Sequence, residues 1–233
     1  MNKTIESDPQ WRESFNEDGF VVIRGFLNAK ELAELNAQID RYIHEVVSKL
    51  NSTEVFYEDK NRPETLKQLP RMNEQDTYFD QEVAKGKFKQ LAEGLLGEGA
   101  RENAVQYFNK PPRMGQSTPP HQDGHYWKIE PCDGLTMWLA LDKVEEENGC
   151  LHYSRGSHKL GLREHHLSGV LGFSQGISDF PNEDDRVGDV AVFAEAGDLL
   201  VHHAKTVHWA SGNDSVARSR KSLGIVYYAP GVV

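Results

Sequence analysis

Residues 119–126 read Pro-Pro-His-Gln-Asp-Gly-His-Tyr. On an extended strand, residues i and i+2 point to the same face, so His121 and Asp123 can both point into a barrel while Gln122 points away. The proline-rich stretch that precedes the triplet, from Lys110 to Pro120, favours its placement at the start of a strand. A His-x-Asp pair and one distant histidine form a 2-His-1-carboxylate set. Such a set holds non-haem Fe(II) on one face and leaves the other face open.

The third ligand has to come from a strand that is a neighbour in space. Three downstream histidines compete for this role: His202, His203 and His208. An arginine on a strand suits the far carboxylate of a bound 2-oxo acid, because its fork donates two parallel hydrogen bonds. His208 leads into a turn at 211–215 and Arg220 is expected on the returning strand, so a hairpin would place ligand and anchor side by side.

Short strands dominate the pattern from about residue 103 onward. The best strand candidates are the apolar runs at 104–108, 135–141, 190–193, 199–202 and 223–228. Gly and Asn residues between these runs mark turns. Many short strands with such turns suggest a barrel or a double-sheet jelly roll of the cupin kind. Residues 160–188 show little periodicity, and we interpret them as an insertion that could cover the mouth of the site.

The first hundred residues favour helices packed on the edge of a barrel. Asn28 is expected to cap a helix, with Glu31 as its capping-box partner. Apolar residues at a 3–4 spacing mark the buried side of that helix, at Leu32, Leu35, Ile39, Tyr42, Ile43 and Val46. A second helical segment has its apolar positions at Val83, Phe88, Leu91, Leu95 and Leu96. The stretch 51–76 between the two is polar and irregular.

Length and composition fit one hydrophobic core. A chain of 233 residues suits a single all-β barrel with additions, and 38% hydrophobic residues suffice for its core. We therefore interpret 1–233 as one domain, with a helical part over about 1–102 packed on a jelly-roll core over about 103–233. The predicted fold class is mainly β with flanking α-helices.

Charge and composition argue against several classes of protein. The net charge of −10 and the pI of about 5.5 argue against a nucleic-acid partner or an anionic membrane surface. The opening residues 1–9 have no apolar core, so no signal peptide is expected. The sequence contains no run of about 18 apolar residues, so no membrane-spanning helix is expected. Cys132 and Cys150 do not predict a disulfide framework. The expected location is a reducing, cytoplasmic compartment, and nothing in the pattern predicts an oligomeric state.

A series of short motifs follows in order along nearly the whole chain. It comprises 18–27, Asn109-Lys110-Pro111-Pro112, 121–126, Trp138, Glu147-Asn148-Gly149-Cys150-Leu151, Arg155-Gly156-Ser157-His158-Lys159, Gly197-Asp198, His203, His208, Asn213 and Arg220. In this combination the chain resembles the phytanoyl-CoA dioxygenase family of Fe(II)- and 2-oxoglutarate-dependent oxygenases. The resemblance implies a double-stranded β-helix, a form of jelly roll that periodicity alone does not separate from a sandwich.

The resemblance also implies roles for particular residues. The family's last metal ligand is the second of two histidines five apart, which selects His208 over His203 to act with His121 and Asp123. The family's arginine for the 5-carboxylate of 2-oxoglutarate falls at Arg220, and the sequence after it continues as the family's strand does. The interval from His208 departs from the commonest family spacing by about one residue, which leaves Arg218 as a rival.

Weaker matches surround the expected site. Trp138 matches a family Trp near the co-substrate, with a plain core aromatic as the alternative. Lys67 falls where the family places a second cation for 2-oxoglutarate, with a solvated loop lysine as the alternative. Gln106 and Asn109 lie on a strand that leads towards the metal and could face the pocket. His125, two residues past the carboxylate, could share its face and contact substrate or order a water.

The implied cofactors are Fe(II), 2-oxoglutarate as co-substrate and O2, and ascorbate is expected to support activity. The implied reaction hydroxylates a small organic substrate and releases succinate and CO2. Asp123 argues for hydroxylation, because related halogenases carry a small residue there and bind chloride. Two alternatives come from other classes: a metal-dependent cupin-type hydrolase or isomerase, which would not need Arg220, and a non-catalytic barrel that binds a small molecule.

Overall fold

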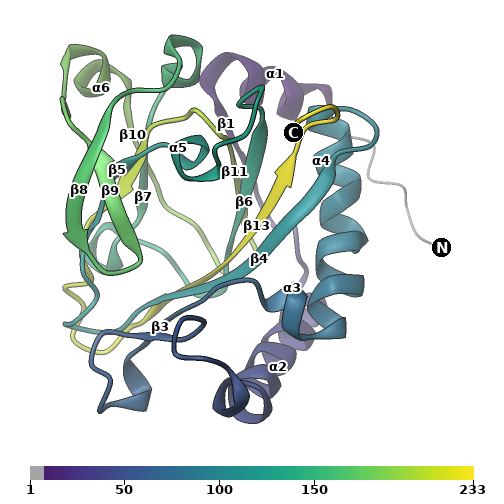
Figure 1. The fold of residues 1–233 in the computed structure, drawn as a ribbon, viewed down its shortest axis with the longest axis vertical. Helices are drawn as coiled ribbons and strands as arrows, with labels where there is room; N and C mark the ends of the chain where they lie inside the picture. Colours follow the sequence, from purple (N-terminus) through teal and green to yellow (C-terminus); the bar gives the residue numbers. More distant parts are fainter. Residues whose placement is uncertain (1–7) are drawn as a thin grey trace.

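Two facing antiparallel sheets, with helices on the outer side of the larger one, form the structure (Figure 1). It is a computed structural model that describes residues 8–233. Most of the opening segment on which the signal-peptide prediction depends lies outside the described residues. Within residues 8–233, no helix combines the length and the apolar character needed to cross a membrane.

The larger sheet has seven strands and the smaller has four. In spatial order, the larger sheet contains β1 (Phe20–Ile23), β11 (Leu199–His203), β6 (Gly134–Ala140), β13 (Arg220–Tyr228), β4 (Arg101–Lys110), β3 (Leu66–Leu69) and β2 (Phe56–Tyr57). The smaller contains β10 (Asp189–Val192), β7 (Leu151–Ser154), β12 (His208–Ala210) and β5 (Thr118–His121). A separate hairpin joins β8 (His165–Val170) to β9 (Phe173–Ile177). The two facing sheets confirm the predicted mainly β, jelly-roll architecture.

The helices lie mostly in the N-terminal part of the chain. They are α1 (Pro9–Asp18), α2 (Ala29–Glu45), α3 (Met72–Gln75), the π-helical segment η3 (Phe79–Lys87), α4 (Phe88–Leu96), α5 (Asp123–Trp127) and α6 (Glu183–Gly188). Short 3-10 turns complete the set: η1 (Val47–Lys49), η2 (Pro63–Thr65), η4 (Glu146–Asn148) and η5 (Ser157–Leu160). The capping box predicted at the start of α2 is confirmed: Asn28 Oδ1 accepts from the Glu31 N–H at 3.0 Å, and Glu31 Oε2 accepts from the Asn28 N–H at 2.9 Å.

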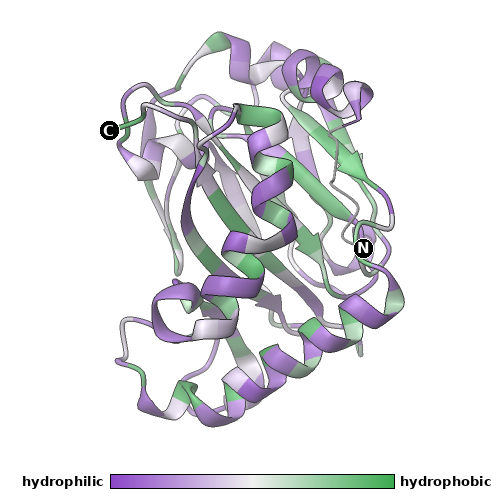
Figure 2. Ribbon diagram, turned by 90° about the vertical axis from the view of Figure 1, so that its right-hand side faces the viewer, coloured by the Kyte–Doolittle hydropathy of each residue, from purple (hydrophilic) through white to green (hydrophobic). Residues whose placement is uncertain are grey.

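Strand alternation divides the interior into two regions. On β13, Leu223, Ile225 and Tyr227 face the helices and belong to the main hydrophobic core. Arg220 and Val226, on the opposite face of the same strand, line a pocket between the sheets. Figure 2 shows the apolar sides of the helices turned towards the sheet and their polar sides turned outward. One sheet therefore supplies an apolar core on one face and a polar site on the other.

Several predictions about the elements are confirmed and others are wrong. All five predicted strands after residue 103 are present. The stretch 51–76, described as polar and irregular, contains β2 and β3, which extend the larger sheet beside β4. The stretch 160–188 contains the β8–β9 hairpin and α6 rather than irregular structure alone. The N-terminal part thus adds three strands to the larger sheet as well as helices, and the single-domain interpretation stays a prediction.

Candidate metal and co-substrate site

The structure brings His121, Asp123 and His208 together between the two sheets. His121 ends β5 and His208 begins β12, and the two are direct cross-strand partners with ring centroids 4.1 Å apart. Asp123 is the first residue of α5, so the predicted strand through the triplet is wrong: β5 ends at His121, and the chain turns into a helix after an extended Gln122. The turn brings the carboxylate back towards both imidazoles.

The donor atoms of these three residues converge. Asp123 Oδ1 lies 3.5 Å from His121 Nε2 and 3.7 Å from His208 Nε2, and all three donor atoms lie within 4.8 Å of one another. His121 Nδ1 lies 2.8 Å from Pro119 O, and His208 Nδ1 lies 3.0 Å from Thr206 O. Since a carbonyl only accepts, each Nδ1 carries the proton, which leaves the Nε2 lone pairs directed at the carboxylate. This donor set fits a 2-His-1-carboxylate iron site.

The second oxygen of Asp123 is already occupied by partners on the larger sheet. Thr136 Oγ1 on β6 donates to Asp123 Oδ2 at 2.5 Å, and His202 Nε2 on β11 donates to the same oxygen at 3.1 Å. Tyr153 OH lies 3.0 Å from His202 Nδ1 and can donate to it. Oδ1 therefore remains directed at His121 and His208. No sequence pattern separates Thr136 from other strand residues, because its role depends on a contact between sheets.

Electrostatics favour an ionised Asp123 and a neutral His208. Burial opposes ionisation of Asp123, but the charges and hydrogen bonds of His208, His121 and His202 outweigh it and hold the pKa of the carboxyl well below its usual range. Burial, together with the neighbouring His121 and His202, holds the pKa of His208 well below its usual range. A divalent cation requires both protonation states in its ligands.

The competing histidine His203 faces another part of the molecule. Its Nδ1 accepts from the Lys205 N–H at 3.0 Å and its Nε2 lies 3.3 Å from Asp133 Oδ1. The structure thus brings His208, not His203, to the carboxylate. His202, the third competitor, is present at the site but contacts Asp123 Oδ2 rather than the converging donor atoms.

Gln122 connects the site to the segments around it. Its buried side chain donates from Nε2 to Gly161 O at 2.8 Å and to Lys205 O at 2.7 Å. Its Oε1 accepts from the Arg163 N–H at 2.8 Å. Although sequence alternation predicted that this residue points away from the metal, it did not predict that Gln122 would join the base of the 160–188 insertion to the segment before β12.

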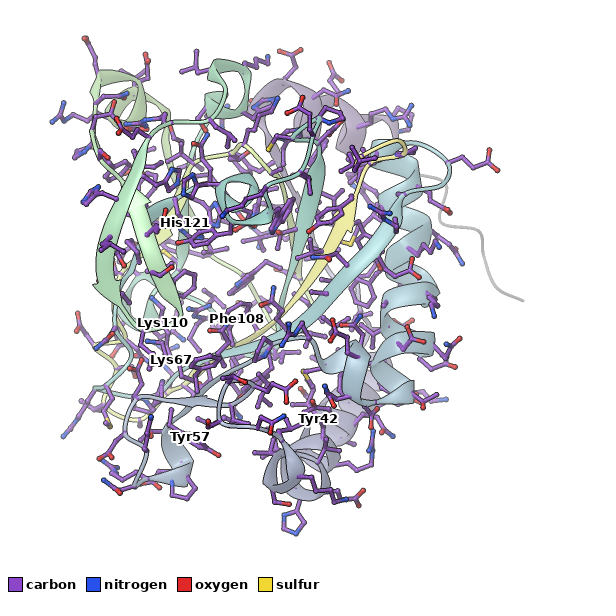
Figure 3. All side chains as sticks on the ribbon, viewed as in Figure 1. Tyr42, Tyr57, Lys67, Phe108, Lys110 and His121 are labelled. Atoms are coloured by element: carbon purple, nitrogen blue, oxygen red, sulfur yellow. The ribbon has the colours of Figure 1, made fainter. Side chains whose placement is uncertain are left out.

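A pocket extends from the three convergent residues along the inner face of the larger sheet. In Figure 3, His121 lies above Phe108, Lys110 and Lys67, which all line this pocket. The pocket is lined by Glu58, Lys67, Gln68, Gln106, Phe108, Asn109, Lys110, Gln116, Ser117, Thr118, His121, Asp123, Trp127, Thr136, Trp138, Leu151, Phe173, His202, His208, Arg220 and Val226. It therefore includes all six residues that the sequence singled out for metal and co-substrate, together with Gln106 and Asn109.

Arg220 lies buried in this pocket, and no carboxylate of residues 8–233 pairs with it. Its guanidinium carbon lies 5.2 Å from the centre of the Trp138 ring, and Nη1 donates to Ser222 Oγ at 3.3 Å. Its Nε has no hydrogen-bond partner in the described part of the chain. Burial lowers its pKa to about 10. The rival Arg218 lies at the surface, where Nη1 donates to Glu145 Oε2 at 2.6 Å.

The predicted hairpin between His208 and Arg220 is wrong. β12 pairs with β5 and β7 in the smaller sheet, whereas β13 pairs with β4 and β6 in the larger sheet. The two residues face the same pocket from opposite sheets. Their proximity thus arises from the stacking of the sheets and not from cross-strand pairing.

Lys67 and Lys110 add two more buried cations. Lys67 is on strand β3 rather than on a solvated loop, and its Nζ lies 3.1 Å from the buried Glu58 Oε1. Lys110 Nζ donates to the carbonyl of Ser211. Burial, followed by the charges of Arg220 and Lys67, holds the pKa of Lys110 well below its usual range. Lys110 belongs to the Asn-Lys-Pro-Pro motif, which was the available sequence signal for it.

The β8–β9 hairpin covers the metal end of the pocket, as the insertion interpretation predicted. The Phe173 ring lies 5.3 Å from the His121 ring and 6.2 Å from that of Phe108. Tyr126 OH donates to Gln175 O at 2.6 Å and so fastens α5 to the hairpin. His125 also contacts Gln175 and does not line the pocket, so the expected inward face for this residue is wrong.

The fold and the site define a jelly-roll protein with a 2-His-1-carboxylate centre, and the comparisons agree with this class. The sequence profile of the family described as Phytanoyl-CoA dioxygenase (PhyH) matches residues 15–222. The chain therefore belongs to the phytanoyl-CoA dioxygenase family, as the motifs predicted.

The curated relatives have low sequence identity to this chain but align with most of its length. A probable α-ketoglutarate-dependent hypophosphite dioxygenase of Stutzerimonas stutzeri is 27% identical over 216 residues, covering 91% of this chain and 75% of that protein. The human peroxisomal phytanoyl-CoA dioxygenase is 26% identical over 227 residues, covering 91% of this chain and 65% of that protein. The chain thus spans less than two thirds of the length of the human relative.

Solved structures show the same fold. The epimerase SnoN, in complex with Fe3+, α-ketoglutarate and nogalamycin RO, has a TM-score of 0.75 at 23% identity, covering 96% of this chain and 84% of that one. EctD from S. alaskensis, with 2-oxoglutarate and 5-hydroxyectoine, has a TM-score of 0.76 at 20% identity, covering 98% and 78%. These structures support the predicted jelly-roll fold, and their bound Fe and 2-oxoglutarate match the predicted cofactors.

Proposed function

We propose that this protein hydroxylates a small organic substrate with Fe(II), 2-oxoglutarate and O2. One observation carries the proposal: the His121–Asp123–His208 set and the buried Arg220, which has no carboxylate partner among residues 8–233, line the same pocket. In the balanced reaction, substrate, 2-oxoglutarate and O2 give the hydroxylated substrate, succinate and CO2. A cytoplasmic location stays a prediction from the sequence.

The three convergent residues would hold the iron. His121 Nε2, His208 Nε2 and Asp123 Oδ1 are directed at one another, while the remaining polar atoms of these side chains contact protein groups. When bound, iron and 2-oxoglutarate supply the activation of O2. Thr136 and His202 fix the orientation of the carboxylate, so the donor atoms are arranged before the metal arrives.

Arg220 would hold the 5-carboxylate of 2-oxoglutarate. A buried guanidinium without an anionic partner is costly, and a carboxylate that accepts two hydrogen bonds would offset that cost. Trp138 restricts the guanidinium through its ring face, and Ser222 holds one of its nitrogens. Arg218 already pairs with Glu145 and Glu147 at the surface, so it has no comparable need for a ligand.

The prime substrate would enter beside the aromatic end of the pocket. Phe173 lies beside His121 and Phe108, and Trp127 also lines the pocket. The glutamines Gln68 and Gln106 line it too and face each other, with Nε2 to Oε1 at 3.5 Å. Aromatic rings and amides can hold a small molecule with both apolar and polar groups. The hairpin that carries Phe173 would also keep water away from the reacting atoms.

The test measures binding and turnover of the co-substrate 2-oxoglutarate. Under anaerobic conditions, Fe(II) and 2-oxoglutarate together should give the visible charge-transfer band of their chelate, and under air the protein should release succinate. The His203→Ala variant is the control and should keep both signals, whereas His208→Ala should lose both. If iron-loaded wild-type protein gave neither the band nor succinate, the alternative functions would be favoured instead: a metal-dependent hydrolase or isomerase, or a non-catalytic barrel that binds a small molecule.

A further inference from the structure

A second group of side chains that could hold a metal ion lies beside the smaller sheet. Glu146 is in η4, Cys150 immediately precedes β7, and His152 is on β7. Leu151 and Tyr153 belong to the core between the sheets, so His152 between them points to the outer face of the smaller sheet. Glu146 is exposed and His152 half-buried, so an ion from solvent can reach these two side chains, whereas Cys150 is fully buried.

The distances in this group match those between ligands of one ion. Glu146 Oε2 lies 3.3 Å from Cys150 Sγ and 3.6 Å from His152 Nε2, and all three donor atoms lie within 4.8 Å of one another. Zinc binds sulfur at about 2.3 Å and nitrogen or oxygen at about 2.0–2.2 Å, so tetrahedral ligands stand about 3.3–3.6 Å apart. The separation of 3.6 Å is too long for a hydrogen bond but suits two ligands of one metal.

His152 is held in the orientation that a metal ligand needs. Its Nδ1 lies 2.8 Å from Asp189 Oδ1 on β10, and its ring stacks on Trp209 at 5.3 Å with an interplanar angle of 23°. A histidine that donates from Nδ1 to a carboxylate presents the Nε2 lone pair on its other side. Here that side faces Glu146 and Cys150. The Cys150 thiol donates to Glu146 Oε2, and an ion bound to both groups would take the place of that proton.

We propose that Cys150, His152 and Glu146 form a second metal site for a divalent ion of the Zn2+ type. Cys150 Sγ, His152 Nε2 and one Glu146 carboxylate oxygen would be the protein ligands, with water in the fourth position. A thiolate, an imidazole and a carboxylate are a donor set that zinc and its spectroscopic substitute Co2+ accept readily. The site is separate from the iron ligands, which include no sulfur, and does not depend on the proposed oxygenase activity.

The difference in donor atoms allows a selective test with Co2+. Iron-free protein is titrated with Co2+ under a non-thiol reductant, and the near-ultraviolet thiolate-to-cobalt charge-transfer band is followed. Because only a cysteine ligand gives this band, Co2+ at His121, Asp123 and His208 does not interfere. The band should saturate when one Co2+ per chain is bound at this site, after at most one further equivalent has filled the iron ligands, and it should disappear when Zn2+ is added.

Matched variants assign the band to this site. Cys150→Ser should abolish it, while Cys132→Ser should leave it unchanged. Asp189→Asn should weaken binding by roughly 10–100-fold, as expected when the partner of a ligand histidine is lost. His152→Gln and Glu146→Gln, two accessible positions, should each weaken it at least as much, which keeps the test decisive even where Cys150→Ser does not fold. No band in the wild type, or full binding in both His152→Gln and Glu146→Gln, would overturn the proposal.

Discussion

Arg220 on β13 and Lys110 on β4 lie directly opposite each other, and both side chains are buried. Burial lowers the pKa of both groups, and the like charge of Arg220 lowers the pKa of Lys110 further. The groups whose charges act on Lys110 are Arg220, Lys67, Glu58 and Cys150. An anionic ligand bound between these two buried cations would reduce their repulsion. The dicarboxylate 2-oxoglutarate is the ligand that we propose.

Replacing Lys110 with Met should make the free protein more stable and less sensitive to pH. The pKa of Lys110 is lower in the folded chain than in the unfolded chain, so the unfolded chain binds more protons between the two values. Stability of the wild type therefore rises with pH through that window and is lowest below it. Lys110→Met should remove this slope and raise the melting temperature at neutral pH by roughly 2–4 °C for each kcal/mol gained.

The same variant should bind 2-oxoglutarate more weakly, which separates a ligand-binding role from a structural one. The exposed Lys60→Met variant is the control and should change neither property. Thermal melts from pH 6 to 10, with and without 2-oxoglutarate, provide both measurements. A Lys110→Met protein that melts lower than the wild type at neutral pH would contradict the charge argument.

Arg220→Ala should weaken 2-oxoglutarate binding on the order of 100-fold or more while leaving iron binding nearly intact. Hydrogen bonds to charged groups contribute about 1.5–3 kcal/mol each, and the guanidinium fork offers two. Arg218→Ala should change the affinity little, because Arg218 pairs with Glu145 and Glu147. Anaerobic titration of both iron-loaded variants provides the comparison. A larger loss of affinity in Arg218→Ala than in Arg220→Ala would move the anchor to Arg218. Small losses in both variants would mean that neither arginine holds the 5-carboxylate.

Alanine at His121, Asp123 or His208 should remove most bound iron and all oxidative turnover while the protein stays folded. His203→Ala should keep its iron, because His203 contacts Lys205 and Asp133 instead. His202→Gln should show an intermediate loss of roughly 10–100-fold in iron affinity, since it orients the carboxylate without binding the metal. Iron content after dialysis and circular dichroism measure these effects. Iron retained by His208→Ala but lost from His203→Ala would reverse the ligand assignment.

Gln122→Met should destabilise the fold strongly although the side chains are similar in size. It would leave three partners without a hydrogen bond, namely the carbonyls of Gly161 and Lys205 and the Arg163 N–H. An unsatisfied buried polar group costs about 1–3 kcal/mol, so we expect a loss of roughly 3 kcal/mol or more. Urea denaturation measures the change, with the exposed Gln90→Met as control. A loss below about 1 kcal/mol would show that water replaces these contacts.

Local pattern determined the direction of side chains within single elements. On β13 the side chains alternate between the pocket-facing Arg220 and the core-facing Leu223, and the predicted Asn28 and Glu31 pair marks the start of α2. The motif order identified the family and five candidate site residues, and Lys67 came from a weaker local match; all six line the pocket. These features need only a few neighbouring residues, because backbone geometry and capping are local.

Tertiary structure alone decided which elements meet. The pattern of β3 is too short and polar to predict a strand, and it is ordered by pairing with β4. His208 and Arg220 look like hairpin neighbours in sequence, yet they belong to different sheets, because strand partners are chosen by burial over the whole chain. His202 and Thr136 reach Asp123 only because the two sheets stack face to face. The sequence by itself therefore determined the ligand types and the fold class, while non-local packing determined their arrangement around the metal.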